Sequence, residues 1–365
     1  MMKGERGFTL LELLMVMIIF GFVLAATSDM FVGILRGYKQ QSKIAETNIE
    51  GIIGLELLRR DIDHAGYGLP WMMSGATYLE ATDANALAYN DSSSNPPRAI
   101  LSDIDANGRA YLVIKAMNVA RNDTCAKWTH LLTSGATTIW TSTNPANENL
   151  NSTDRVIVIS PGTPVTNSRA LVAPTSFPST LQFVSATTYK SPDETRIIYG
   201  VDPPAATPLR MPFNRADYYV STPADIPGRC AQGTGVLYKA IVSQSDGSFP
   251  TANILPLLDC VADMQVITYL DTNGDGEVDD KRSVLFAGTD AKMIREQLKE
   301  VRVYILAHEG QRDTSYTHPT NPILVGESAT LGRNFDFTTA VPSIPNWQNY
   351  RWKVYTLVVK PNDLR

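Results

Sequence analysis

The hydrophobic pattern changes twice along the chain. Residues 8–28 are almost wholly apolar, and a helix of this length would span about 31 Å, one bilayer core. Apolar side chains then recur every three or four residues, as on a helix that buries one face. This stripe consists of Ile49, Ile52, Leu55, Leu58, Ile62 and Ala65. Because the first proline is Pro70, the pattern predicts one helix from Phe8 to His64.

Beyond Pro70 the pattern favours strands. Short β-branched and aromatic runs alternate with polar segments rich in glycine and proline, which is typical of antiparallel sheets with long loops. The expected strands are 111–115, 155–160, 195–200, 236–242, 264–270, 301–307 and 352–359. A short helix is expected over 289–300, and long loops over 78–97 and 133–153. The fold class is therefore α+β, with a long N-terminal helix packed on an antiparallel β-sheet head.

Composition excludes some partners. Hydrophobic residues make up 44% of the 365 positions and charged residues 19%, so the chain has enough apolar surface for a folded core. The formal net charge is −5, and no run of lysine and arginine stands out. Nucleic acid is therefore not an expected partner.

One acid interrupts the apolar stretch near its start. A charge such as Glu12 is costly within a membrane span and needs a reason. A secretory signal peptide, with Lys3 and Arg6 as its basic region and cleavage after Ala25, would place Glu12 where the apolar region should begin. A simple one-span anchor also leaves Glu12 unexplained.

The hexapeptide GFTLLE, residues 7–12, resembles the type IV prepilin signature after a short charged leader. The resemblance implies that a prepilin peptidase cuts between Gly7 and Phe8 and methylates the new N-terminus. In a filament, Glu12 would then pair with the α-amino group of Phe8 in a neighbouring subunit, which would favour assembly and fix the axial register.

This resemblance divides the chain into four parts. Residues 1–7 would be the leader peptide, 8–28 the transmembrane and filament-core helix, 29–66 the amphipathic half of the helix, and 67–365 the globular head. Before assembly the chain would cross the bacterial inner membrane once, with its head in the periplasm. After assembly it would lie in a pilus at the cell surface.

Three further segments resemble the PilW family of minor type IV pilins. They are LRRDIDHAGYG (58–68), LKEVRVYILAHEG (298–310) and YRWKVYTLVVKPNDL (350–364). The resemblance implies a minor pilin that primes filament assembly or forms a tip complex and displays an adhesin. Its implied partners are other minor and major pilins and the inner-membrane assembly platform. Two alternatives stay open: a type II secretion pseudopilin, and a secreted calcium-dependent binding protein cleaved by ordinary signal peptidase.

The segment DTNGDGEVDD, residues 271–280, has the spacing of a calcium loop. Asp271, Asn273, Asp275 and Asp279 occupy positions 1, 3, 5 and 9 of an EF-hand-like loop, and the backbone carbonyl of Glu277 serves position 7. Position 12 lacks the usual glutamate, so weak Ca²⁺ binding is expected, on the order of 10⁻⁴–10⁻³ M. The alternative is a hairpin turn without metal.

The three cysteines allow one disulfide and one free thiol. Cys230 and Cys260 each precede an expected strand, so pairing of those strands would bring them together. Such a bridge would contribute about 3–4 kcal/mol in the chain-entropy model. A bridge that uses Cys125 instead stays open.

Nothing in the sequence indicates catalysis. The nucleophile-elbow, zinc-protease, phosphate-loop and dinucleotide motifs are all absent, so no enzyme is expected. Asp61 and Asp63 are expected on a solvated helix face. His64 is expected to pack or cap the helix, and His308 to lie at the surface or be satisfied in the core.

Overall fold

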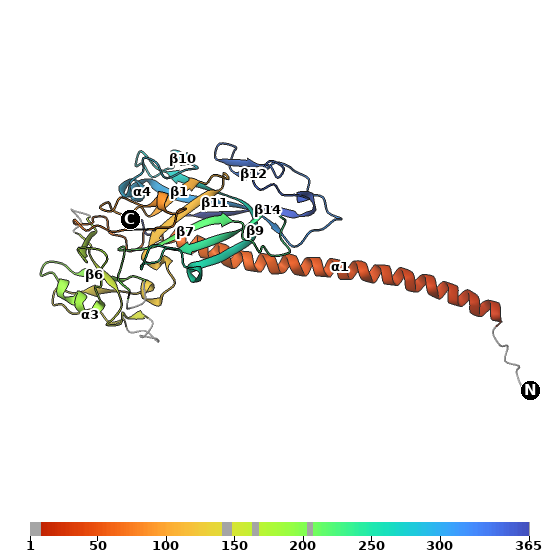
Figure 1. Cartoon of the computed structure of the whole chain (residues 1–365), viewed down its shortest axis with the longest axis horizontal. Helices are drawn as coiled ribbons and strands as arrows, with labels where there is room; N and C mark the ends of the chain where they lie inside the picture. The colour runs from red at the N-terminus through yellow and green to blue at the C-terminus, as the bar shows by residue number, and fades with distance from the viewer. Residues whose placement is uncertain (1–8, 141–147, 163–167, 203–206, 365) are drawn as a thin grey trace, which may run out of the picture.

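The computed structural model describes residues 9–140, 148–162, 168–202 and 207–364. One helix, α1 (Leu10–Asp63), runs for 54 residues without a break. Figure 1 shows α1 leaving one end of the head and curving gently away from it. The expected start at Phe8 lies outside the described residues.

In the described residues, the head is built from antiparallel strands in three sheets. The largest has the order β1-β2-β7-β8-β9-β11-β14, with the short β10 also paired to β9. Its strands are β1 (Ile100–Ile104), β2 (Ala110–Ala116), β7 (Asn214–Ser221), β8 (Gly235–Ile241), β9 (Ile254–Leu270), β10 (Asp280–Arg282), β11 (Leu298–Glu309) and β14 (Arg351–Val359). The α+β class, a long helix followed by an antiparallel sheet domain, is confirmed.

Two smaller sheets flank this one. A four-stranded sheet has the order β3-β6-β4-β5, and β12 pairs with β13. Their strands are β3 (Trp128–Leu131), β4 (Val156–Ser160), β5 (Ala170–Ala173), β6 (Arg196–Gly200), β12 (Ile323–Gly326) and β13 (Gly332–Phe335). The short helices are α3 (Phe183–Ala186) and α4 (Ala291–Gln297). Figure 1 shows β6, α3, α4 and the C-terminus at the end of the head opposite the N-terminus.

Each of the seven expected strands is present, with shifted ends. The largest difference is β9, which covers 17 residues where only 264–270 were expected. The expected helix over 289–300 is too long, because residues 298–300 already belong to β11. β7 was missed because Arg215 and Asp217 are fully buried in it and interrupt its apolar pattern.

The large sheet has two covered faces because side chains alternate along its strands. On β11, Val303 and Ile305 belong to the core shared with α1, whereas Tyr304 and Leu306 face a second core under β12 and β13. α1 contacts β9, β11 and β14 on the first of these faces. The long helix is therefore part of the main core at its C-terminal end.

The helix face that meets the sheet differs from the expected stripe. Leu55, Leu58, Ile62 and Ala65 are buried as expected, but Ile52 is 65% exposed, so its predicted packing against the head is wrong. Instead, the neighbouring face carries Gly51 and Gly54 against the start of β9. A Cβ added at Gly54 would lie 1.9 Å from the carbonyl oxygen of Leu257, so the two backbones approach too closely for any side chain.

The last residues of the chain close over the end of α1. Asn362 donates its side-chain amide to Asp63 Oδ1 at 2.6 Å, and His64 Nδ1 lies 2.8 Å from Asp363 Oδ2. The expected role of His64 at the helix end is confirmed, since it is the C-cap residue. The three segments at 58–68, 298–310 and 350–364 are therefore neighbours in space, with β11 paired to β14 and both in contact with α1.

Candidate assembly site on the N-terminal helix

The first turn of α1 is closed by a pair of reciprocal hydrogen bonds. Glu12 N donates to Thr9 Oγ1 at 3.3 Å, and Thr9 N donates to Glu12 Oε2 at 2.9 Å. Thr9 Oγ1 also donates to the same carboxylate oxygen. This is a capping box, which satisfies helix amide groups that have no partner in the preceding turn.

The capping box gives Glu12 a partner within its own chain. The expected cut between Gly7 and Phe8 falls outside the described residues, but it would leave Thr9 and its amide in place. Glu12 therefore has two uses for its carboxylate: a local one in the cap, and an intermolecular one with the amino group of another subunit.

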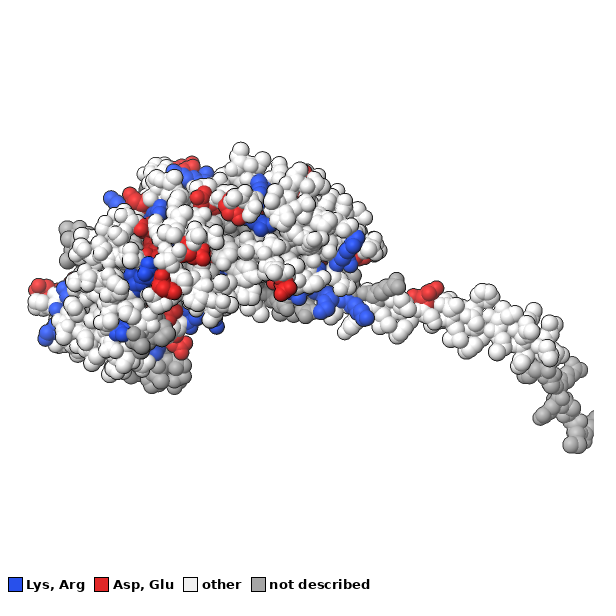
Figure 2. Space-filling view, viewed as in Figure 1, with Lys and Arg blue, Asp and Glu red and all other residues white. Residues whose placement is uncertain are grey.

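The outer part of α1 has no contact with the head. From Leu10 to Leu35 each described side chain is exposed, and Leu10 itself is 82% exposed. Further along the helix, Ile44 lies beside Gly310 of the head. The part of α1 from Leu10 to Ile44 contains an 18-residue window with a mean hydropathy of 2.5, so it is long and apolar enough to cross a membrane. Figure 2 shows this part of the helix almost free of charged side chains, while both signs of charge are scattered over the head.

The inner part of α1 is fixed to the sheet by a buried ion pair. Asp61 contacts both Lys239 Nζ of β8 and the hydroxyl group of Tyr218 on β7. All three residues are buried, and burial, reinforced by the charge of Asp61, raises the pKa of Tyr218 well above its usual value. The expectation that Asp61 lies on a solvated face is wrong, because helical spacing places it beside Leu58, three residues earlier, which is buried in the core.

An open apolar groove of about 780 Å³ follows the line where α1 meets β9. Leu57 of α1 and Leu255, Pro256 and Leu257 of β9 line it. Ile53 also lines the groove and is 68% exposed. The groove is therefore a second exposed apolar surface, on the inner part of α1.

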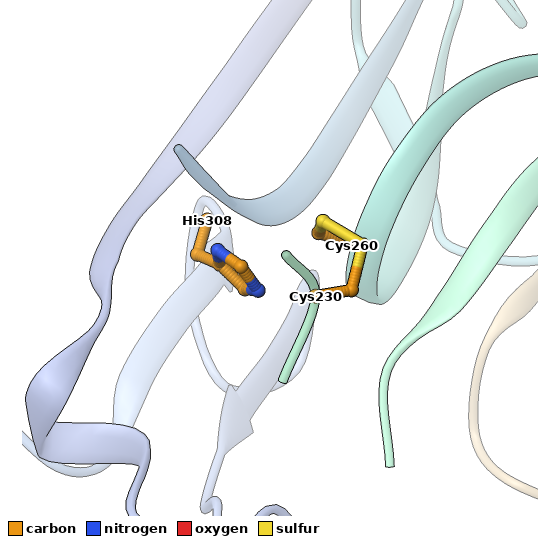
Figure 3. A group of neighbouring side chains, drawn as sticks. All are labelled: Cys230, Cys260 and His308. Atoms are coloured by element: carbon orange, nitrogen blue, oxygen red, sulfur yellow. A yellow bond between two sulfur atoms is a disulfide. The ribbon is translucent and has the colours of Figure 1, made fainter. Parts of the chain in front are cut away.

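A disulfide joins Cys230 to Cys260, with 4.8 Å between their Cα atoms. This is the pair favoured by the strand argument, since β8 and β9 are neighbours, and Cys125 is a free, buried thiol. Figure 3 shows His308 beside the disulfide. A histidine nitrogen and the two sulfur atoms lie within 4.8 Å of one another, but the sulfurs are committed to each other.

His308 is buried and only partly satisfied. Its Nε2 accepts a 2.8 Å hydrogen bond from Ala231 N, whereas Nδ1 has no partner among the described residues. Burial lowers the pKa of His308 to about 3. The surface position expected as one alternative for His308 is therefore wrong; the other alternative, a core position, is right, although only one of the two ring nitrogens is hydrogen-bonded among the described residues.

The expected calcium loop is the connection between β9 and β10. Asp271 accepts hydrogen bonds from Gly274 N and Gly276 N and lies 2.8 Å from Lys299 Nζ. Asp279 accepts from Thr272 N, and Asp275 accepts from Glu277 N. The hydrogen bond from Lys299 lowers the pKa of Asp271. The loop therefore brings the predicted side chains onto one turn, and it also supplies them with internal partners.

Comparison with protein families identifies the start of the chain. Residues 2–28 match the prokaryotic N-terminal methylation motif. The chain is a type IV pilin-like protein. This motif, on a long apolar helix followed by an antiparallel sheet domain, implies processing by a prepilin peptidase, a membrane anchor and assembly with other pilins. Comparison with curated proteins and with solved structures gave no match.

Two features of this pilin-like protein were missed from sequence. The capping box has a readable signal, a threonine three residues before a glutamate at the start of an apolar run. The Asp61–Lys239 pair has none, because the two residues are far apart in the chain and their pairing depends on the order of β7, β8 and β9.

Proposed function

We propose that this protein is a minor subunit of a type IV filament, placed at or near the tip, where it helps to start assembly. The observation that carries the proposal is the exposed apolar helix behind a methylation motif, with a single acid near its start. An exposed apolar surface of this length needs a membrane or neighbouring helices to cover it.

The head supports a minor rather than a bulk subunit. It comprises three sheets and a main core that extends over most of the chain. A head of this size is easier to accommodate at the end of a filament than in a crowded shaft. The type II secretion pseudopilin is the second candidate, since the same motif and helix serve it. Before assembly, the proposal places the head in the periplasm and α1 in the inner membrane.

Glu12 is proposed to change partners on assembly. In the free subunit its carboxylate closes the capping box with Thr9. In the filament it pairs with the α-amino group of Phe8 from a neighbour, which removes an unpaired charge from an apolar bundle. The groove beside Ile53 and Leu57 extends the apolar surface available to a packed neighbour.

Glu12→Gln separates these two uses. Glutamine also caps a helix from this position, so the variant keeps the local hydrogen bond and loses only the charge. We expect mature protein at the normal level in the membrane and a loss of incorporation into filaments of roughly tenfold or more. Quantitative immunoblotting of membrane and sheared-filament fractions measures both.

The control is Asp193→Asn, an exposed acid of the head that lies outside the groove between α1 and β9. It should be incorporated normally. Normal incorporation of the Glu12→Gln subunit would reject the proposed pairing. Mass spectrometry of the mature N-terminus should find methylated Phe8, whereas a chain that begins at Ala26 would indicate signal-peptidase cleavage and a secreted protein. Co-purification with pilins or with secretion pseudopilins distinguishes the two filament types.

Weak calcium binding by the β9–β10 loop remains a proposal. Calcium would take the place of Lys299 beside Asp271 and draw on Asp275 and Asp279. Millimolar calcium should then raise the Tm of the head by roughly 2–4 °C, and Asp275→Ala should abolish that rise. Differential scanning calorimetry with calcium or with a chelator decides it. An unchanged wild-type Tm would leave the loop as a metal-free hairpin.

A further inference from the structure

A second cavity lies at the far end of the head from the membrane helix. It has a volume of about 470 Å³, within the range of small-ligand sites. One wall is formed by α4 and the residues before it, and the other by Trp71 and the segment from Asp91 to Arg98. Figure 1 places α4 beside the C-terminus, opposite the projecting end of α1.

The cavity contains a positive charge without an anionic partner. Arg295 is half-buried, and among the described residues its side chain makes no hydrogen bond or ion pair. Its guanidinium carbon lies 4.7 Å from the centre of the Trp71 ring, so the charge is held in place by an aromatic face. Burial lowers the pKa of Arg295; the charges of Glu296 and Asp290 act in the opposite direction, and Arg169 adds to the lowering. This side chain is placed where a bound anion would stabilise it.

The acids of the cavity are already engaged. Asp91 Oδ1 pairs with Arg98 Nε at 2.5 Å, and its Oδ2 pairs with Lys115 Nζ at 2.6 Å. Asp290 caps α4 by accepting a hydrogen bond from Met293 N. Because Asp91 and Asp290 use their carboxylates in these contacts, the guanidinium group of Arg295 is available to a ligand.

The remaining walls offer neutral hydrogen-bonding groups. Ser92 and Asn95 line the cavity and are exposed, and no partner of their side chains is found in the described part of the chain. Lys292 adds an exposed ammonium group, 4.0 Å from Glu296. A cavity of this volume is larger than one carboxylate group requires, so the ligand should be larger than a simple anion. A sugar acid fits this lining, because its carboxylate can pair with a cation and its hydroxyl groups can form hydrogen bonds with the hydroxyl and amide side chains.

We propose that the cavity between Trp71 and α4 binds an acidic saccharide, whose carboxylate pairs with Arg295 and whose hydroxyl groups contact Ser92 and Asn95. Its position opposite the membrane helix leaves the cavity accessible to an external polymer. The inference is independent of the filament assignment, because it depends only on residues of the head.

Calorimetric titration of the detergent-solubilised full chain tests the ligand class. D-Glucuronate should bind with a Kd on the order of 1 mM or tighter. The neutral methyl glucoside, acetate and inorganic phosphate should each bind about tenfold more weakly, because each lacks either the charge or the hydroxylated ring. Equal binding of acetate, phosphate and glucuronate would mean an adventitious ion only, and would overturn the proposal, as would no binding of glucuronate.

Variants test the residues. Arg295→Gln should weaken glucuronate binding about tenfold or more, and Lys292→Gln about two- to fivefold. Arg282→Gln, an exposed arginine on β10 that pairs with Asp280, should bind as the wild type does. Unchanged affinity of folded Arg295→Gln would reject the assignment. If Arg295→Gln does not fold, the test depends on Lys292→Gln, because Lys292 is exposed and its replacement should not affect folding. Unchanged glucuronate affinity of Lys292→Gln would then reject the site.

Discussion

The two halves of α1 belong to one unbroken helix, but the outer half exposes its side chains whereas the inner half buries one face against the sheet. The outer half exposes apolar residues on all sides from Leu10 to Leu35. The inner half buries one face through close backbone contact at Gly54, apolar packing at Leu58 and an ion pair at Asp61. The comparison shows that the stability of the head depends on the inner half, while the outer half is left free for a membrane or for other subunits.

The largest effect should come from the buried ion pair. Asp61→Ala leaves Lys239 charged, buried and without this partner, and we expect a loss of about 3–5 kcal/mol in the free energy of unfolding of the head. Denaturant titration measures it. The double variant Asp61→Ala with Lys239→Met should recover much of the loss, because it removes the isolated charge as well.

Glu56→Gln is the matched control on the same helix, because Glu56 and its partner Arg59 are exposed. Exposed pairs contribute little, so the unfolding curve should hardly move. Equal destabilisation by Asp61→Ala and Glu56→Gln would contradict the view that the inner face is specifically built into the core.

A smaller effect should separate two glycines of α1. Gly54→Ala places a methyl group against the backbone of Leu257 and should cost about 1–3 kcal/mol. Gly37→Ala meets open space, and there the better helix propensity of alanine should stabilise α1 by up to about 1 kcal/mol. Chemical denaturation of the head and the helical signal in circular dichroism report the two changes. Equal changes in stability at Gly54 and Gly37 would contradict the view that only the inner half of α1 packs closely on the sheet.

A further effect should be a pH dependence of the stability of the head, whose size grows with the pH interval compared. Because burial lowers the pKa of His308 to about 3, the unfolded chain binds its proton from about pH 6.5 downward while the folded chain does not. This histidine therefore reduces stability as the pH falls from 6.5 towards 3, by up to about 1.4 kcal/mol per pH unit.

Asp263 acts in the opposite direction. Burial raises its pKa to about 6, so the folded state binds a proton before the unfolded state as the pH falls. The informative quantity is therefore the difference between the wild type and His308→Gln. On acidification from pH 6.5 to pH 4 the wild type should lose stability relative to His308→Gln. A constant difference would show that His308 does not titrate as its burial requires.

The helix and the seven strands could be predicted from local patterns in the sequence. A proline-free apolar run and β-branched segments express local preferences that the fold respects. The disulfide could be predicted because Cys230 and Cys260 lie next to two strands that were expected to pair. The motif at residues 7–12 was recognisable because its chemistry is contained in six consecutive residues.

The rest depended on contacts between distant segments. β7 does not show a hydrophobic pattern because Arg215 and Asp217 interrupt it. These two charged residues can be buried in the core because they form an ion pair with each other. The helix register was misjudged at Ile52 because close backbone packing favours glycine, which an apolar pattern does not count. Arg295 and Trp71 are brought together only by the fold, so the cavity at the far end of the head had no signal in the sequence.

The closure of the chain's last residues over the end of α1 has a consequence for biogenesis. β14 and residues 362–364 stand far from α1 in the sequence, yet β14 pairs with β11 in the large sheet, and Asn362 and Asp363 contact the C-terminal end of the helix. A nascent chain that has not yet reached β14 lacks these contacts. The seating of α1 on the sheet therefore depends on a segment that is synthesised long after the helix itself.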